Sequence, residues 1–297
     1  MIGSVAASLV QFAPGRPSAN LKVILGQIRA AARADRPRLV VFPELALSGF
    51  PVRDVVATER LGHSERLDRI DRTARSAGVY AVAGFAELAE DGAVHNSAAL
   101  FTPDGLASVV RKQRLPGREQ RWFAPGGPPA VTVTGIGAIG IAICYDAWFP
   151  EYVKSQARQG AEIIVNINSI WGGGSAGGIG GARVKGRYWR VVPVARALDT
   201  QAYVLACNGS GSHDFGDSAG VWRRLGRSRV VDPAGRVVAT APTEGDAVVT
   251  ATLTAAAVDR ARRAIHLLAD SAGTTSGVPA GGPAPGNGTY TTEREQT

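Results

Sequence analysis

The chain has 297 residues, of which 45% are hydrophobic and 20% are charged, and these proportions are typical of a soluble globular protein with a sizeable core. No apolar run approaches the length that spans a bilayer, so a membrane partner is not expected. The net charge is +8, but the basic residues are scattered without interleaved aromatic residues, so nucleic acid is not an expected partner.

Local groups of basic residues and the two cysteines add little to this picture. One such group is Arg223, Arg224, Arg227 and Arg229. We expect this group to be solvated surface. The two cysteines lie far apart, and the N-terminal segment lacks a basic region, which disfavours both a disulfide framework and a secretory signal. These features predict a cytoplasmic protein.

Short apolar runs rich in β-branched residues recur along the chain and predict strands. The runs are Val5–Phe12, Leu39–Phe42, Val79–Ala83, Ser97–Phe101, Ala107–Val110, Ala130–Thr134, Ile139–Ile143, Ile163–Ile167, Ala202–Ala206, Ser228–Val231, Arg236–Ala239 and Ala247–Leu253. Helical periodicity between them predicts helices over 21–28, Leu61–Ala77, Tyr152–Gln159 and Arg183–Asp199, and a last helix from about Val258. The alternation of strands and helices predicts α/β layers.

One predicted helix contains an interruption, and one end of the chain has an unusual composition. Within Arg183–Asp199, one apolar face is expected to contain Tyr188, Val191, Ala195 and Leu198. Pro193 is expected to kink or split the helix. No linker divides the chain before about residue 270. Residues 271–297 are rich in Gly, Pro, Ser and Thr and predict a disordered tail. We therefore expect one domain over residues 1–270.

Cys144 ends the apolar run AIGIAI and precedes a segment, YDAWFPE, whose Pro and Glu suit the first turn of a helix. Backbone N–H groups at such a position stabilise a thiolate and an oxyanion. Position alone leaves two interpretations open, a buried structural thiol and a nucleophile. Cys207 lies inside an apolar run without such a turn, and we interpret it as core.

A cysteine nucleophile needs a base, and of the four histidines only His95, in the segment HNS, could stand at a strand end beside other polar groups. Glu44 follows an apolar strand in VVFPELALSGF, where a cleft would raise the pKa of its carboxyl group. Lys112 ends another strand and could hold an oxyanion, and Glu119 could orient that lysine. Each of these three residues, taken singly, could equally be a surface charge.

Three segments together resemble the signature segments of the nitrilase superfamily, the carbon–nitrogen hydrolases. They are FPELALSGF, RKQRLPGREQRWFAPG and ICYDAWFPE, and the likeness continues through QGAEIIVNINSIW, ARALDTQAYVLACNGSG and GRSRVVDPAGRVVA. The resemblance covers roughly residues 4 to 255. It implies a four-layer α-β-β-α sandwich and a homodimer or larger homo-oligomer.

The resemblance also implies a reaction. Glu44 would be the general base, Lys112 would hold the oxyanion with the backbone N–H of Tyr145, Cys144 would be the nucleophile, and Glu119 would be the second glutamate of the family. A thioester would form and be hydrolysed, releasing ammonia or an amine. No metal and no cofactor are expected, since the sequence offers no Cys/His cluster.

The substrate remains open among several classes. The segment Cys-Tyr-Asp, in place of the Cys-Trp-Glu of nitrilases, favours a small amide or N-carbamoyl compound over a nitrile. Trp148 stands where ω-amidase-like members have arginine, and with Trp171 it could form an apolar or cation-accepting wall. Alternatives are a nitrilase, an amide-forming acyltransferase, or a non-catalytic member that acts by interaction. The glycine-rich run 172–181 contains a weak match to a dinucleotide fingerprint, which we interpret as a loop near the active site.

Overall fold

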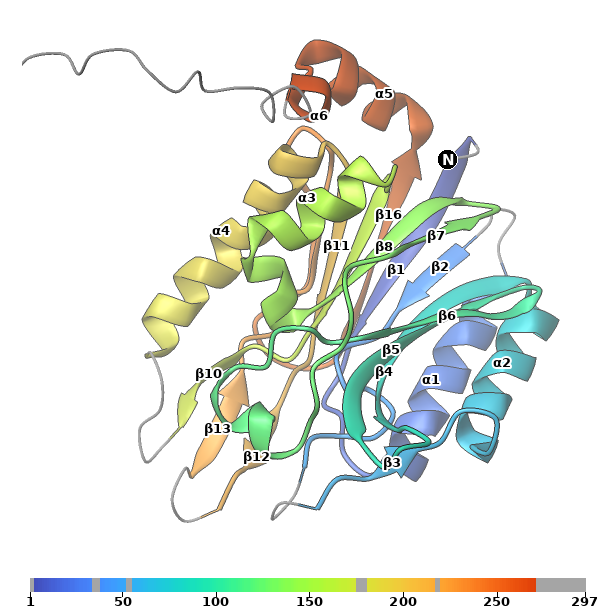
Figure 1. The fold of residues 1–297 in the computed structure, drawn as a ribbon, viewed down its shortest axis with the longest axis vertical. Helices are drawn as coiled ribbons and strands as arrows, with labels where there is room; N and C mark the ends of the chain where they lie inside the picture. Colours follow the sequence, from blue (N-terminus) through green and yellow to red (C-terminus); the bar gives the residue numbers. More distant parts are fainter. Residues whose placement is uncertain (1–2, 34–37, 52–54, 175–180, 217–219, 271–297) are drawn as a thin grey trace, which may run out of the picture.

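The structure is a computed structural model that describes residues 3–33, 38–51, 55–174, 181–216 and 220–270. Two large sheets lie face to face, and a pair of helices covers the outer side of each (Figure 1). The order of layers is therefore α-β-β-α, as expected from the family resemblance. The expected tail over residues 271–297 and most of the glycine-rich run, residues 175–180, lie outside the described residues.

The first sheet has the order β16-β1-β2-β4-β5-β6, with β3 paired to β4. Its strands are β1 (Ser4–Gln11), β2 (Arg38–Val41), β3 (Thr58–Glu59), β4 (Val79–Leu88), β5 (Val94–Thr102), β6 (Gly105–Arg111) and β16 (Ala247–Thr254). Neighbouring strands β1, β2 and β4 are parallel, whereas β5 and β6 form an antiparallel hairpin. Helices α1 (Pro17–Ala31) and α2 (Glu65–Ala77) cover the outer face. The apolar residues predicted on α1 are buried there, including Ile24 and Ile28.

The second sheet has the order β15-β14-β11-β9-β8-β7. Its strands are β7 (Val131–Thr134), β8 (Gly137–Ile143), β9 (Ile163–Asn168), β11 (Tyr203–Asn208), β14 (Arg229–Val231) and β15 (Val237–Thr240). Helices α3 (Pro150–Arg158) and α4 (Ala182–Thr200) cover its outer face. Strands β8, β9 and β11 are parallel, so their carboxyl ends meet at one edge of the sheet.

Smaller elements complete the molecule at its two ends. A third sheet of β10 (Trp171–Gly174), β13 (Val221–Arg224) and β12 (Ser212–Asp214) lies at the lower end in Figure 1. Helices α5 (Ala255–Ala264) and α6 (Leu267–Asp270) lie at the upper end. Two short 3-10 helices, η1 (Gly117–Arg121) and η2 (Cys144–Trp148), follow β6 and β8. Since β9 leads into β10 and β11 into β12, the third sheet adjoins the carboxyl ends of the second.

Helix α4 departs from the sequence prediction in two respects. Pro193 does not split it, because the helix runs from Ala182 to Thr200 and buries Pro193 beside Trp189 and Ala197. Packing on this side outweighs the backbone hydrogen bond that proline removes. The predicted apolar face is not buried in the chain, since Tyr188, Val191 and Leu198 are about half exposed.

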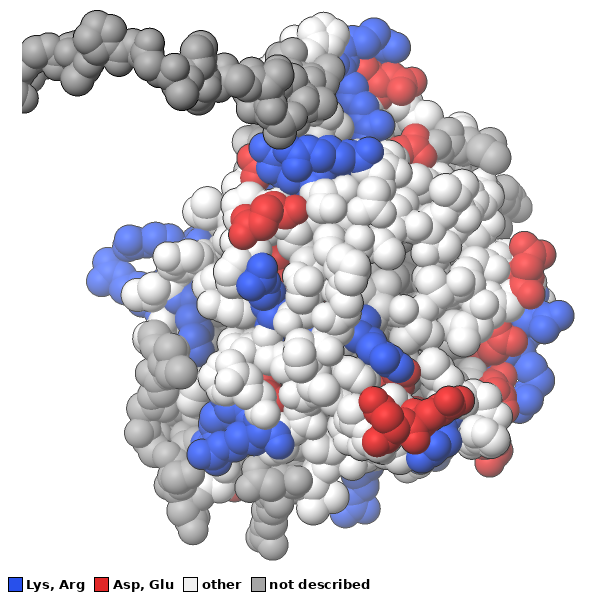
Figure 2. Space-filling model, viewed as in Figure 1, with Lys and Arg blue, Asp and Glu red and all other residues white. Residues whose placement is uncertain are grey.

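The basic group in and after β13 also differs from the prediction. Arg224 is 2% exposed and Arg229 is 6% exposed, whereas Arg223 and Arg227 lie at the surface. Arg223 and Arg224 differ because they are successive residues of β13, and successive side chains of a strand point to opposite faces of the sheet. On the face shown in Figure 2, acidic and basic residues are interspersed around a broad uncharged area. Among the described residues, no helix is long and apolar enough to cross a membrane.

Candidate active site

Glu44 follows β2 in a tight turn that is completely buried. The turn is held by hydrogen bonds from the backbone N–H of Leu47 to the carbonyl of Gly84 and from that of Glu44 to the carbonyl of Asn168. Leu45 has a φ of +52°, a conformation that non-glycine residues rarely adopt. A Cβ atom at Gly84 would lie 2.5 Å from the backbone nitrogen of Leu45. Close packing of β4 against this turn therefore fixes the direction of the Glu44 side chain.

The carboxylate of Glu44 uses its two oxygens differently. Oε1 accepts hydrogen bonds from Lys112 Nζ at 2.7 Å and from Asn96 Nδ2 at 2.8 Å. Oε2 is buried and has no hydrogen-bond partner. A buried carboxylate oxygen without a donor is costly, and it is ready to accept a proton. The arrangement suits a base whose orientation is fixed by one oxygen while the other reacts.

Lys112 follows β6 and is completely buried. Its Nζ donates to Glu119 Oε2 at 2.6 Å as well as to Glu44, so the lysine bridges the two carboxylates. Burial opposes the charge of Lys112, but the two glutamates outweigh burial and raise its pKa well above the usual value. Burial raises the pKa of Glu119 to about 7, against the attraction of Lys112. The lysine therefore stays charged across the physiological range of pH.

Cys144 begins η2 directly after β8, at the strand end predicted from the sequence, and it is 7% exposed. Its φ is +49°, so the nucleophile candidate occupies a strained left-handed position. Burial raises the pKa of the Cys144 thiol well above its usual value, and the negative charge of Glu44 adds to this effect. The backbone N–H of Ser169, just after β9, donates a hydrogen bond to the Cys144 sulfur. The resting state is a thiol beside a carboxylate.

Asp146 connects the cysteine turn to the lysine segment. Its buried carboxylate accepts hydrogen bonds from the backbone N–H of Arg114 at 2.7 Å, of Gln113 at 3.3 Å and of Ile143 at 3.4 Å. Gln113 is the residue after Lys112, and Ile143 is the residue before Cys144. Burial raises the pKa of Asp146 to about 6. One side chain thus fixes the distance between the two reactive segments.

The four residues predicted from the signature segments lie together, and three further residues join them. Lys112 contacts both Glu44 and Glu119, and the charges of all three act on Cys144. The additional residues are Asn96, Asp146 and Ser169. Asn96 follows His95 in β5 and offered only a polar residue inside an apolar strand as a signal. Asp146 was marked only by its place two residues after the cysteine.

The residues predicted to contact substrate lie among aromatic side chains. Trp148 stacks on Tyr188 with the ring centroids 4.9 Å apart, and its ring also contacts Tyr145 at 5.6 Å. Trp171 contacts Phe50 at 5.2 Å, and one face of its ring is covered by the Arg224 guanidinium at 3.9 Å. The cation that Trp171 was expected to accept is therefore supplied, on that face, by the chain itself.

Two other sequence expectations concern thiols and metals. Cys207 lies in β11, completely buried, with its sulfur within hydrogen-bond distance of the carbonyls of Val10 and Val41. This is the core position predicted for it. Among the described residues there is no group of three or more His, Cys, Asp or Glu side chains placed to hold a metal ion.

The sequence is similar to those of known proteins. The sequence model of the family described as Carbon-nitrogen hydrolase matches residues 6–263. An (R)-stereoselective amidase from a Pseudomonas species is 34% identical over 234 residues, which cover 77% of this chain and 78% of the relative. Omega-amidase NIT2 from Xenopus tropicalis is 28% identical over 249 residues, which cover 80% of this chain and 84% of the relative.

A solved structure shares the whole layered architecture. The crystal structure of Nit3 from Saccharomyces cerevisiae, a member of branch 10 of the nitrilase superfamily, matches with a TM-score of 0.74 and 25% identity. The match covers 89% of this chain and 95% of that chain. The four-layer α-β-β-α fold expected from the signature segments is confirmed by this likeness.

Proposed function

Because the chain belongs to the carbon–nitrogen hydrolase family and is an enzyme of that class, we propose that it hydrolyses the C–N bond of a small amide or N-carbamoyl compound through a thioester on Cys144. The observation that carries this proposal is that buried Lys112 bridges Glu44 and Glu119. The charges of Lys112, Glu44 and Glu119 all affect the pKa of the neighbouring Cys144 thiol. In such a site one oxygen of Glu44 is anchored and the other is free to move a proton.

The first step is attack on the substrate carbonyl. Glu44 Oε2 takes the proton of the Cys144 thiol as the sulfur bonds to the carbonyl carbon. General-base assistance is needed because burial and Glu44 hold the pKa of the thiol well above neutrality. The electron pair of the C=O bond moves to oxygen, and the charged Lys112 Nζ with the backbone N–H of Tyr145 stabilises the oxyanion.

The second and third steps regenerate the enzyme. When the C–N bond breaks, Glu44 gives its proton to the leaving nitrogen, and ammonia or an amine departs from the thioester. Glu44 then takes a proton from water, and the resulting hydroxyl bonds to the acyl carbon. The C–S bond breaks, the sulfur recovers a proton, and a carboxylate or carbamate is released. Asn96 and Glu119 act as positioning residues because they hold Glu44 and Lys112.

The choice of an amide substrate rests on relatives and on the nucleophile segment. The two relatives described above carry names that identify them as amidases, and their alignments cover most of this chain. The Cys-Tyr-Asp segment at the nucleophile also differs from the Cys-Trp-Glu that the sequence resemblance associates with nitrilases. An amide or N-carbamoyl group presents the carbonyl oxygen that Lys112 is placed to stabilise.

The direct test is an ammonia-release screen over small amides, N-carbamoyl compounds and nitriles. The proposal predicts release from at least one amide or carbamoyl compound, none after Cys144→Ala, and retained release after Cys207→Ala, the matched buried thiol. Release from nitriles alone would favour the nitrilase. Transfer of the acyl group to an added amine in preference to water would favour the acyltransferase, and no release from any compound would favour a non-catalytic role.

We also propose that residues 1–270 form one domain that pairs through α4 as a homodimer. Tyr188, Val191 and Leu198 expose an apolar face on that helix. The surface of a monomeric protein rarely carries a contiguous apolar patch, so this face is suited to contact a second copy of the chain. Val191→Asp is expected to shift the protein to monomers in sedimentation velocity. Val133→Asp changes a valine that is even more exposed, on β7, and it should leave the dimer intact. A monomeric wild-type protein would contradict the proposal.

A further inference from the structure

Arg224 is the largest fully buried side chain among the described residues. Its guanidinium makes two hydrogen bonds, from Nε to Ser169 Oγ at 2.8 Å and from Nη1 to the carbonyl of Ser210 at 3.1 Å. Nη2 has no hydrogen-bond partner, and no carboxylate of the described residues forms an ion pair with this arginine. Burying a charge without a counter-ion is strongly unfavourable, so the chain keeps a cation here at a cost.

The surroundings of Arg224 are shaped to hold it. A Cβ atom at Gly209 would lie 2.6 Å from Arg224 Cδ and 3.0 Å from Nε, so the absence of a side chain at position 209 makes room for the arginine. The guanidinium lies over the ring of Trp171, with its carbon 3.9 Å from the ring centroid, and 5.6 Å from that of Phe50. Stacking of this kind fixes the plane of the guanidinium and leaves its N–H edge for an acceptor.

Arg224 belongs to the same neighbourhood as the reactive groups. The hydroxyl of Ser169 accepts from Arg224, while the backbone N–H of the same residue donates to the Cys144 sulfur. Burial lowers the pKa of Arg224 to about 9, and the negative charge of Glu44 acts in the opposite direction. The arginine remains charged at neutral pH, and it interacts electrostatically with Glu44, the proposed base. A group bound to Nη2 would therefore be near a substrate attached to Cys144.

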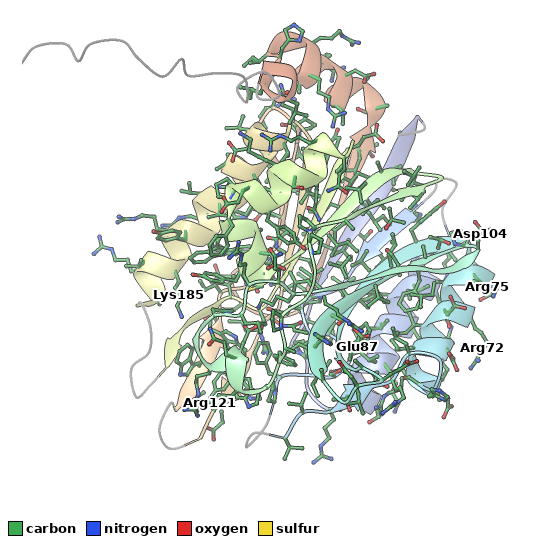
Figure 3. The ribbon with its side chains drawn as sticks, in the orientation of Figure 1. Arg72, Arg75, Glu87, Asp104, Arg121 and Lys185 are labelled. Atoms are coloured by element: carbon green, nitrogen blue, oxygen red, sulfur yellow. The ribbon has the colours of Figure 1, made fainter. Side chains whose placement is uncertain are left out.

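A second cation reaches this neighbourhood from α4. Lys185 Nζ lies 4.8 Å from the ring centroid of Trp222, and the lysine is half-buried. Figure 3 shows Lys185 near the start of α4, the helix that packs against β10. Trp222 and Arg224 are two positions apart on β13, so their side chains share one face of that strand. Electrostatic interaction between Lys185 and Cys144 links this cation to the reaction centre as well.

We propose that Arg224, assisted by Lys185, binds a carboxylate of the substrate, so that the preferred substrates are small amides that carry a second, anionic group. A carboxylate would give the buried Nη2 the acceptor that it lacks and would supply the missing counter-ion. Its amide end would extend toward Cys144. The inference rests on the proposed function for the site of attack, but the binding of an anion does not depend on turnover.

A purely structural role for Arg224 fits the contacts less well. A neutral side chain could donate the same two hydrogen bonds and pack against the same two aromatic rings without the cost of a buried charge. The alternation of β13 also places Arg223 at the surface, where it pairs with Glu244 at 2.6 Å. The two neighbouring arginines thus provide a matched comparison, one buried without an acidic partner and one exposed with such a partner.

The test is calorimetric binding to the full-length Cys144→Ala protein, which cannot form the thioester. The probes are succinamate and glutaramate, with succinamide and glutaramide as neutral matches of the same length. We expect at least one acid amide to bind about 10- to 100-fold more tightly than its diamide, as a charge-assisted hydrogen bond requires. Arg224→Met should abolish this preference, whereas Arg223→Met should keep it.

Several outcomes would overturn the inference. The first is that the Cys144→Ala protein binds each acid amide and its diamide equally tightly. The second is that it binds neither acid amide. The third is that the preference for an acid amide over its diamide remains after Arg224→Met. If Arg224→Met does not fold, Lys185→Met decides, because this half-exposed lysine can be changed without opening the core. Loss of part of the preference then supports the inference, and an unchanged preference refutes it.

The same probes separate this inference from the proposed hydrolysis. If wild-type protein releases no ammonia from any amide but Cys144→Ala binds acid amides through Arg224, the anion site stands and the proposed hydrolysis fails. If ammonia is released equally well from acid amides and diamides, the hydrolysis stands and the anion site fails.

Discussion

Lys112 Nζ lies 2.7 Å from Glu44 Oε1, and both side chains are completely buried. A buried ion pair of this kind adds little net stability, but the loss of either partner leaves an uncompensated charge. The pair instead fixes the carboxylate that faces the thiol and keeps the ammonium charged. The consequences can be measured on each residue in turn.

Replacement of Glu44 by Gln should separate the charge state of Cys144 from catalysis. The negative charge of Glu44 raises the pKa of the Cys144 thiol, so its removal should lower that pKa. The rate of alkylation by iodoacetamide should therefore reach half its maximum at a lower pH than in wild type. Hydrolysis should nevertheless fall by at least about 100-fold, because general-base catalysis contributes about that much or more. An unchanged or higher alkylation midpoint would contradict this account.

Replacement of Glu119 by Gln should change the acid side of the pH–rate profile. Burial holds the pKa of Glu119 at about 7, so activity should fall as the pH decreases through that value and the carboxylate that holds Lys112 is neutralised. The variant should lose this limb and turn over about 10- to 100-fold more slowly, the worth of a hydrogen bond to a charged group. Steady-state rates between pH 5 and 9 provide the measurement. The idea fails if the same limb persists in the variant.

Replacement of Asp146 by Asn should destabilise the cysteine turn. The carboxylate accepts three backbone N–H groups, whereas an amide nitrogen would face at least one of them, at a cost of about 1 to 3 kcal/mol. Burial raises the folded-state pKa of Asp146 to about 6, above its usual value of 3.8. Since the folded state holds the proton more tightly, this residue's contribution to stability should decrease as the pH rises from 3.8 to about 6.

Urea unfolding at pH 4 and pH 7 checks both statements about Asp146. The variant should lack the part of the pH dependence that comes from this residue. Asp259→Asn, on the exposed side of α5, is the control and should behave as wild type. Equal stability of Asp146→Asn and wild type at pH 7 would rule out the proposed anchoring role.

Replacement of Gly84 by Ala should disturb Glu44 without touching its side chain. The added Cβ would lie 2.5 Å from the nitrogen of Leu45 and 2.9 Å from the Cα of Glu44, both backbone atoms that cannot easily move. Overpacking should cost about 1 to 3 kcal/mol and reduce the rate of hydrolysis. Gly26→Ala, on α1 with open space around it, should instead gain about 0.5 to 1 kcal/mol. Full activity of Gly84→Ala would show that the turn is not fixed by β4.

The sequence allowed the reactive residues to be predicted, but not all of their contacts. Glu44, Lys112 and Cys144 could be placed at strand ends because periodicity marks where strands stop. The hydrogen bonds of Asn96 and Asp146 could not be foreseen, since they join segments that are distant in the sequence. Asn96 on β5 contacts Glu44 after β2, and Asp146 in η2 contacts Arg114 after β6. Local sequence patterns do not show which distant segments come within hydrogen-bond distance of each other.

The face that an element buries was the least predictable feature of the chain. Arg224 stands in a basic segment that reads as surface, yet it is buried against Trp171. The face of α4 with Val191 and Leu198 reads as core, yet it is exposed. Both differences arise because a helix or strand can bury either face, and the neighbouring sheet decides which one.

The central claim, a thioester on Cys144, is tested most directly by mass spectrometry of enzyme that is quenched in acid during turnover of a hydrolysed amide. The account predicts a mass increase equal to the acyl group on the peptide that contains Cys144, and no increase on that peptide after Cys144→Ala. An acyl group on the Cys207 peptide, or continued ammonia release by the Cys144→Ala protein, would contradict it.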